Sequence, residues 1–119
     1  MDTQCYDALS PTCPSRIILN RIGDRWTIYV IMALSNEVLR FTELKNRIGV
    51  VTPKVLTETL RALESDGLVA REVFAEVPPR VEYRLTELGI SLLEPISAIR
   101  AWAEQHVPEV LEARERAAA

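Results

Sequence analysis

Apolar residues recur every three or four positions in four stretches before residue 67, and this spacing predicts amphipathic helices. Residue types that begin and end helices separate the stretches. Thr52-Pro53 is one such start, because threonine caps a helix and proline fits its first turn. Gly67 suits the left-handed position that follows a helix end. The predicted helices cover residues 14–22, 24–34, 42–48 and 53–66.

Two apolar-rich runs, 68–74 and 81–85, predict an antiparallel β-hairpin. Residues 75–80 lie between them and include two prolines, which cannot donate hydrogen bonds to a strand ladder. We therefore expect a loop there, with Arg80 at the tip of the hairpin. A shorter run, 38–41, predicts one small strand.

A long last helix is predicted to begin at Thr86. Pro95 should kink it or leave one hydrogen bond unmade. Pro108 begins a final charged segment that is either helical or frayed. The apolar positions of this helix, spaced by four, four, three and three, are Leu88, Leu92, Ile96, Ile99 and Trp102.

The predicted order is helix, helix, short strand, helix, helix, strand, strand, helix. It describes a mainly α chain with a small β-hairpin, an α+β fold of the winged helix-turn-helix type. The 119 residues suffice for one domain with its own core. Apolar and charged residues make up 48% and 26% of the chain, ordinary proportions for a globular protein.

Composition also bears on the compartment. No apolar run approaches the roughly 18 residues of a membrane span, and the first ten residues lack the basic and apolar regions of a secretory signal. Two cysteines do not make a disulfide framework. We therefore expect a cytoplasmic protein with no membrane partner.

Positive charge is concentrated in one part of the chain, although the formal net charge is −3. Residues 14–61 hold eight basic and four acidic residues, a balance of +4, whereas residues 86–119 hold three basic and six acidic residues, a balance of −3. One surface could therefore face a polyanion while the acidic end faces away.

The fourth predicted helix combines an apolar face with a face suited to a DNA major groove. Lys54, Thr57, Glu58 and Arg61 share the polar face. Arginine can read guanine edges, threonine can contact bases, and lysine can bind phosphate. Arg80 on the hairpin could reach the minor groove or a phosphate. The alternative is an ordinary solvated face with a Lys54–Glu58 ion pair and a solvated loop arginine.

Several motifs together resemble one family of bacterial regulators. The sequence is similar to the HxlR-type, MarR-like winged helix-turn-helix transcriptional regulators over roughly Cys13–Trp102. The motifs are C13-P14, I22-G-D-R-W26, R40-F-T-E-L44, T52-P-K-V-L-T57, L60-R-A-L-E-S-D-G-L-V69, V77-P-P-R-V-E-Y83 and L85-T-E-L-G89.

The resemblance implies a homodimer that binds double-stranded operator DNA and acts as a repressor or with dual control of an adjacent gene. In the family the first and last helices form the dimer interface. The candidate interface residues are then Ile17, Ile18, Ile22, Leu92, Ile96, Ile99 and Trp102, although Trp102 could equally be a core residue. The candidate DNA contacts are Arg40, Thr52, Pro53, Lys54, Thr57, Glu58, Arg61 and Arg80. The expected division is a flexible arm (1–12), the winged helix-turn-helix domain with its dimerisation helices (13–107) and a charged tail (108–119).

Cys13 is a candidate redox or electrophile sensor. Several members of the family use a cysteine just before the first helix in this way. The chemistry agrees, because unpaired N–H groups at a helix start and the nearby Arg16 favour a thiolate. Oxidation could join Cys13 to its copy in a second subunit, to Cys5 or to a small thiol. The alternative is a small buried residue that fills space.

Other functions fit the residues less well. An enzyme is not expected, because the one histidine, His106, has no partner at catalytic or metal-ligand spacing and no phosphate-binding glycine motif is present. A non-DNA interaction module on the same fold should have lost its cations. A regulator controlled by a small-molecule ligand, held near Trp26, Tyr29 and Trp102, stays open. No cofactor or metal is expected.

Overall fold

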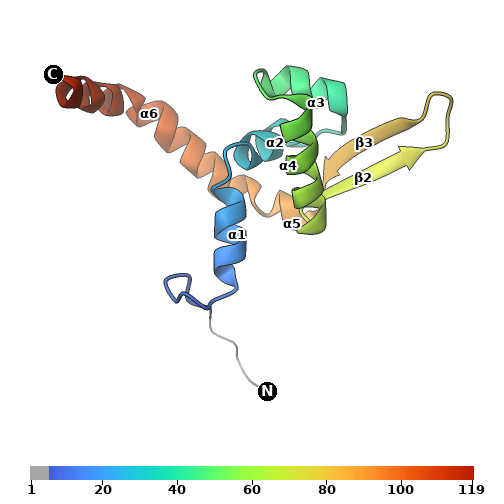
Figure 1. Cartoon of the computed structure of the whole chain (residues 1–119), viewed down its shortest axis with the longest axis horizontal. Helices are drawn as coiled ribbons and strands as arrows, with labels where there is room; N and C mark the ends of the chain where they lie inside the picture. The colour runs from blue at the N-terminus through green and yellow to red at the C-terminus, as the bar shows by residue number, and fades with distance from the viewer. Residues whose placement is uncertain (1–5) are drawn as a thin grey trace.

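A computed structural model describes residues 6–119; residues 1–5, which include Cys5 and the start of the expected arm, lie outside the described part of the chain. The elements in chain order are α1 (Ser15–Ile22), α2 (Thr27–Ala33), β1 (Leu39–Arg40), α3 (Phe41–Ile48), α4 (Pro53–Ser65), β2 (Val69–Phe74), β3 (Arg80–Leu85), α5 (Glu87–Ile90) and α6 (Leu93–Ala118) (Figure 1). The predicted mainly α chain with a small antiparallel sheet is confirmed.

The core forms where the apolar faces of α2, α3 and α4 meet the base of the hairpin. On α4 the buried side chains are Leu56, Thr59, Leu60 and Leu63, on the face that the sequence spacing selects. Thr52 caps this helix as expected, because its Oγ1 accepts a hydrogen bond from the Val55 N–H at 3.2 Å. Gly67 ends the turn after α4 with φ +76°.

The sheet has three strands in the order β1-β3-β2, all antiparallel. The short strand predicted at 38–41 is therefore an edge strand of the hairpin sheet, with Leu39 opposite Tyr83. In the hairpin itself Arg71 lies opposite Tyr83 and Phe74 lies opposite Arg80. The register thus begins at Arg80, so the loop covers 75–79 and Arg80 belongs to β3. The expected position of Arg80 at the tip is corrected by this pairing.

The last predicted helix is divided into two, which corrects the expected kink at Pro95. Thr86 does cap α5, with its Oγ1 accepting from the Gly89 N–H at 3.1 Å. The chain then breaks at Ser91-Leu92, so Pro95 falls in the first turn of α6, where no intrahelical N–H is needed. Pro108 lies inside α6, which continues as helix to Ala118.

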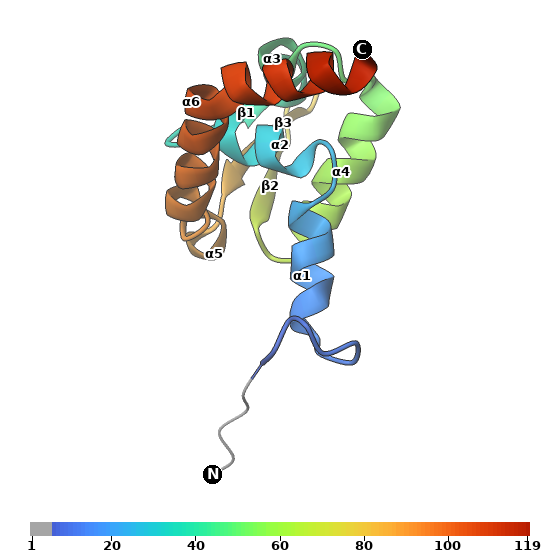
Figure 2. The same cartoon turned by 90° about the vertical axis from the view of Figure 1, so that its left-hand side faces the viewer.

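The break lets α5 pack closely on the start of β2. A Cβ added to Gly89 would lie 2.1 Å from the Leu68 carbonyl oxygen, so only glycine fits there. The chain then leaves the core along α6, which extends on the side opposite the hairpin (Figure 1), and Figure 2 shows α6 passing alongside α2. The molecule is accordingly flat, 57 × 48 × 24 Å.

Candidate nucleic-acid interface

The outer face of α4 carries the polar residues that the sequence predicted. Lys54, Glu58 and Arg61 are exposed, and Thr57 is half-buried, with its Oγ1 donating a hydrogen bond to the Pro53 carbonyl at 2.8 Å. Thr52 and Pro53 are exposed at the N-terminal end of the same helix. The structure thus brings six of the eight candidate DNA contacts together on one helix.

The other two candidates lie outside α4. Arg40 is exposed at the junction of β1 and α3, where its backbone N–H donates to Glu43 Oε1 at 2.8 Å. Arg80 lies at the base of the hairpin loop. Its guanidinium is 3.3 Å from both Glu76 and Glu82, and it lies 4.0 Å from the centre of the Phe74 ring. The charge of Arg80 is therefore partly compensated within the hairpin.

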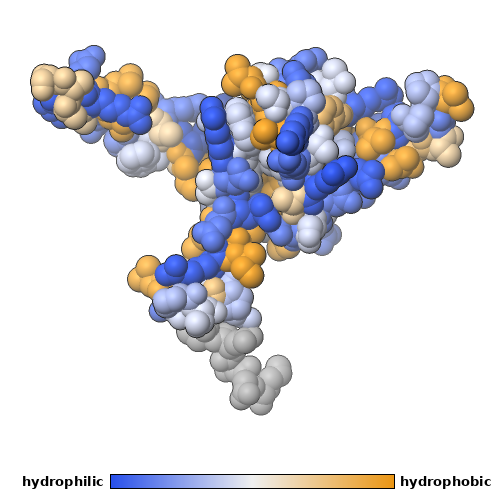
Figure 3. Space-filling model, viewed as in Figure 1, coloured by the Kyte–Doolittle hydropathy of each residue, from blue (hydrophilic) through white to orange (hydrophobic). Residues whose placement is uncertain are grey.

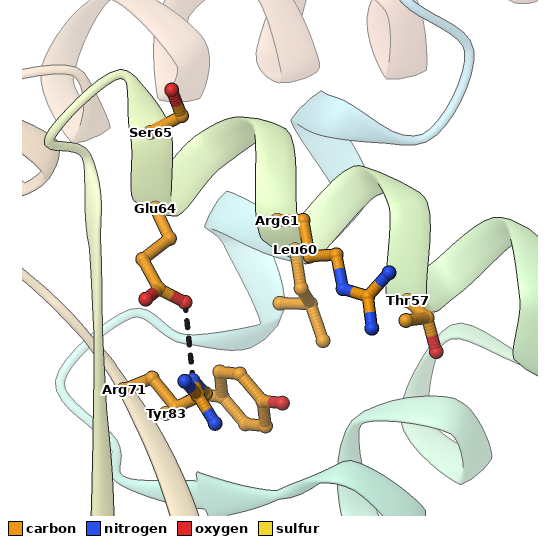
Figure 4. Close-up of a pocket in the computed structure, with 7 residues that line it drawn as sticks. All are labelled: Thr57, Leu60, Arg61, Glu64, Ser65, Arg71 and Tyr83. Atoms are coloured by element: carbon orange, nitrogen blue, oxygen red, sulfur yellow. Dashed lines mark ion pairs between the residues drawn. The ribbon is translucent and has the colours of Figure 1, made fainter.

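A cavity of about 400 Å³ opens between α4 and the hairpin (Figure 4). Five of its lining residues come from α4, four of them polar, and two come from the strands. Arg71 of β2 and Tyr83 of β3 face α4, and the Arg71 Nε is 3.3 Å from Glu64 Oε2. The full lining is Thr57, Leu60, Arg61, Glu64, Ser65, Arg71 and Tyr83.

Sequence reasoning missed Arg71 and Tyr83. Both lie on strands that it predicted, but the two runs differ in length, so the residue spacing alone does not give the register that places Arg71 opposite Tyr83. Burial raises the pKa of the Tyr83 phenol, with smaller influences from the charges of Arg71, Glu64 and Arg61. The phenol therefore stays protonated at neutral pH and can donate a hydrogen bond.

The surface around this region is hydrophilic. In the view of Figure 1, hydrophilic side chains cover much of the surface over α4 and the adjoining hairpin base (Figure 3). Apolar side chains are also present in this view, at the hairpin tip and along α6. The surface over α4 in this view is thus suited to a polar and hydrated partner.

Cys13 lies directly before α1 and is half-buried. Its Sγ is 2.9 Å from the Ser15 Oγ. This hydrogen bond lowers the pKa of the Cys13 thiol. Desolvation acts in the opposite direction, and weaker backbone hydrogen bonds at Ser15 and Asp7 add to the lowering. The thiol is therefore more easily deprotonated than an ordinary cysteine and remains reachable.

The candidate dimer residues divide into exposed and buried groups. Ile17, Ile99 and Trp102 are 66%, 51% and 58% exposed, on α1 and α6. Ile18, Ile22 and Leu92 are half-buried. Ile96 is only 2% exposed and packs in the core of its own chain, so its side chain is not available to a second copy; this corrects its expected place in the interface. Further along α6, Val107, Val110 and Leu111 are also exposed apolar side chains.

The residues proposed around a small-molecule site do not share one cavity. Tyr29 lines a groove between α2, α3 and α6, together with Met32, Ile48 and Ile99. Trp26 packs against the core and against Tyr29, and Trp102 stacks on His106. His106 Nδ1 lies 2.9 Å from the Trp102 carbonyl.

In residues 6–119 no group of three or more metal-ligating side chains is brought together, and none of the helices is long and apolar enough to span a membrane.

Comparisons with known proteins agree with the fold. The sequence pattern of the family described as HxlR-like helix-turn-helix matches residues 21–111. An uncharacterized HTH-type transcriptional regulator of Escherichia coli (strain K12), YtfH, is 42% identical over 107 residues, which are 90% of this chain and 85% of YtfH.

Solved structures give the same result. YtfH of Salmonella typhimurium superposes with a TM-score of 0.85 at 37% identity, covering 93% of this chain and 99% of that one. The redox regulator HypR in its reduced form superposes with a TM-score of 0.76 at 37% identity, covering 84% of this chain and 98% of HypR.

Proposed function

The chain belongs to the HxlR-like helix-turn-helix family, a family of transcriptional regulators rather than enzymes, and from this we propose that it represses transcription as a homodimer bound to operator DNA. The observation that carries the proposal is the outer face of α4. Lys54 and Arg61 are exposed there beside the half-buried Thr57, next to a hairpin of the kind that contacts a neighbouring groove.

Each α4 would enter a major groove by this face. Arg61 lies two turns after Lys54, so the helix can offer a cation to phosphate near its start and a bidentate donor to a base further along. Glu58 lies between them and would accept from a cytosine amino group or exclude a phosphate. The homodimer would present two such helices to two half-sites.

Dimerisation through α1 and α6 is the second part of the proposal. Ile17, Ile99 and Trp102 are large apolar side chains that are more than half exposed in the single chain. A second copy covering them would remove this surface from water, at roughly 25 cal/mol for each Å² buried.

The proposed effector is an oxidant or electrophile that modifies Cys13. The support is the lowered pKa of the thiol, its half-buried position before α1 and the likeness to HypR, which is named a redox regulator. Because the thiolate is the reacting form, Cys13 should be modified ahead of an ordinary cysteine. A modified side chain at the start of α1 would alter how the two copies pack.

The experiment is fluorescence anisotropy with a labelled duplex from upstream of the chain's own gene and a scrambled duplex of equal composition. The reduced protein is expected to bind the upstream duplex at least tenfold more tightly than the scrambled one. Equal affinities would contradict sequence-specific regulation.

The thiol switch is tested in the same assay after diamide treatment. We expect the unchanged protein and Cys5→Ser to lose affinity for the upstream duplex and Cys13→Ser to keep it. Loss in all three proteins, or retention in all three, would contradict the role of Cys13 while leaving the DNA-binding proposal intact.

A further inference from the structure

We infer that the cavity between α4 and the hairpin holds one phosphate of the DNA backbone, with Arg71 and Tyr83 as the donors and Glu64 as an internal counter-ion that the phosphate displaces. This inference rests on the proposed function. It adds a second contact to the DNA backbone, made by residues of the hairpin and separate from the outer face of α4.

The path of the DNA backbone leads to this cavity. In B-DNA a sugar-phosphate strand separates the major groove from the minor groove. If α4 lies in the major groove and the hairpin approaches the adjacent minor groove, the strand between the grooves must cross the surface between α4 and the hairpin. The cavity of about 400 Å³ is at that place (Figure 4).

The donors in the cavity are held by the sheet. Arg71 and Tyr83 are directly opposite each other in the register of β2 and β3, so their side chains leave the same face of the sheet. A guanidinium offers five N–H donors in a fork that matches phosphate oxygens. The Tyr83 phenol adds one O–H donor beside it. The two residues therefore supply both a positive charge and oriented hydrogen-bond donors for a phosphate.

Glu64 forms an ion pair with Arg71 in the protein without DNA. The Arg71 Nε lies 3.3 Å from Glu64 Oε2, and both side chains are partly exposed, at 46% and 39%. Because the pair is solvated, exchanging the carboxylate for a phosphate costs little. The same carboxylate repels an approaching phosphate, so Glu64 should weaken binding to every DNA sequence alike.

The proposed Arg71 contact is to the DNA backbone, so its effect on binding can be distinguished experimentally from base reading by Arg61. Removal of Arg71 should weaken binding to the upstream and scrambled duplexes by the same factor. It should also remove about one counter-ion from the salt dependence, so that the slope of log K against log salt becomes less steep by roughly 1.

The test is fluorescence anisotropy of both duplexes at several salt concentrations with Arg71→Ala, Tyr83→Phe, Glu64→Gln and the control Arg84→Ala. Arg84 is the next residue of β3, on the opposite face of the sheet, so its removal changes the net charge equally. Circular dichroism melting checks that each variant is folded.

We expect Arg71→Ala to lower affinity about tenfold on both duplexes. Tyr83→Phe should lower it less, Arg84→Ala should change it little, and Glu64→Gln should raise it by up to about fivefold. The gain in Glu64→Gln does not depend on the stability of the arginine variant.

Four results would overturn the inference. Equal losses in Arg71→Ala and Arg84→Ala would indicate a general charge effect, and a loss confined to the upstream duplex would make Arg71 a base-reading residue. Reduced affinity in Glu64→Gln would exclude its role as a displaced counter-ion. If the unchanged protein bound neither duplex, the proposed function would fail together with this site.

Discussion

Arg21 Nε lies 2.6 Å from Asp66 Oδ2, and this ion pair joins α1 to the C-terminal end of α4. Asp66 is the C-cap residue of α4, at the partially negative end of the helix dipole, where its negative charge is unfavourable. Arg21 compensates that charge. The pair therefore connects the helix proposed for dimerisation with the helix proposed for reading DNA.

Removing Arg21 should destabilise the fold. We expect Arg21→Ala to lower the free energy of unfolding by about 1 kcal/mol, because both side chains are mostly shielded and Asp66 is left against the dipole. Asp66→Asn should cost little once Arg21 is absent. Urea denaturation of the two single variants and the double variant measures the coupling. Strictly additive effects would show that the pair contributes nothing.

Arg61 is expected to read a base. Arg61→Ala should weaken binding to the upstream duplex by about 1–3 kcal/mol, the range for one bidentate base contact, and weaken binding to the scrambled duplex far less. Anisotropy titrations measure both affinities. Arg114→Ala, at the exposed far end of α6, is the control for net charge. Equal weakening of both duplexes by Arg61→Ala would reassign Arg61 to phosphate.

Trp102 is expected to be covered by a second copy of the chain. Its side chain is 58% exposed on α6, so Trp102→Glu should place a charge in the proposed interface and shift the protein toward monomer. Light scattering after size-exclusion chromatography measures the mass at several concentrations. Val77→Glu, on the fully exposed hairpin loop, should leave the mass unchanged. A monomeric unchanged protein would contradict the interface.

Ser15 is expected to set the reactivity of Cys13. The Ser15 hydroxyl lowers the pKa of the Cys13 thiol, so the rate of alkylation by iodoacetamide should rise with pH and reach half its plateau at a lower pH than it does for an ordinary cysteine. Ser15→Ala should move that midpoint to higher pH, because the thiolate loses a donor. Cys5→Ser in both proteins leaves Cys13 as the alkylated residue. An unchanged midpoint in Ser15→Ala would contradict this role of the hydroxyl.

Much of the fold could be predicted from local residues, and the errors have physical causes. Thr52-Pro53 and Gly67 fixed both ends of α4, and the spacing of its apolar residues gave the buried face. The break at Ser91-Leu92 has weak local markers, Gly89 before it and Pro95 after it, which the apolar spacing of three and four residues across the break outweighed. Pro95 was therefore expected inside a helix although it lies in a first turn.

The part of the candidate site that lies on α4 could be predicted, because helical spacing shows which residues share one face of a helix. Residue spacing cannot tell a chain's own core from a partner surface: Trp102 follows Ile96 by six positions, about 120° away around the helix, so one is buried and the other exposed. Arg80, Arg71 and Tyr83 depended on the hairpin register, which is set by the loop length and by packing across the sheet.

Hydroxyl-radical footprinting of the reduced protein on DNA upstream of its own gene tests directly whether a dimer reads this DNA. We expect two protected, symmetry-related segments whose centres are one helical turn, about 10–10.5 base pairs, or a whole multiple of it apart. Arg61→Ala should lose this pattern at concentrations where Arg114→Ala keeps it. A single unpaired segment, or protection without preference for any sequence, would contradict a dimer that reads two half-sites through α4.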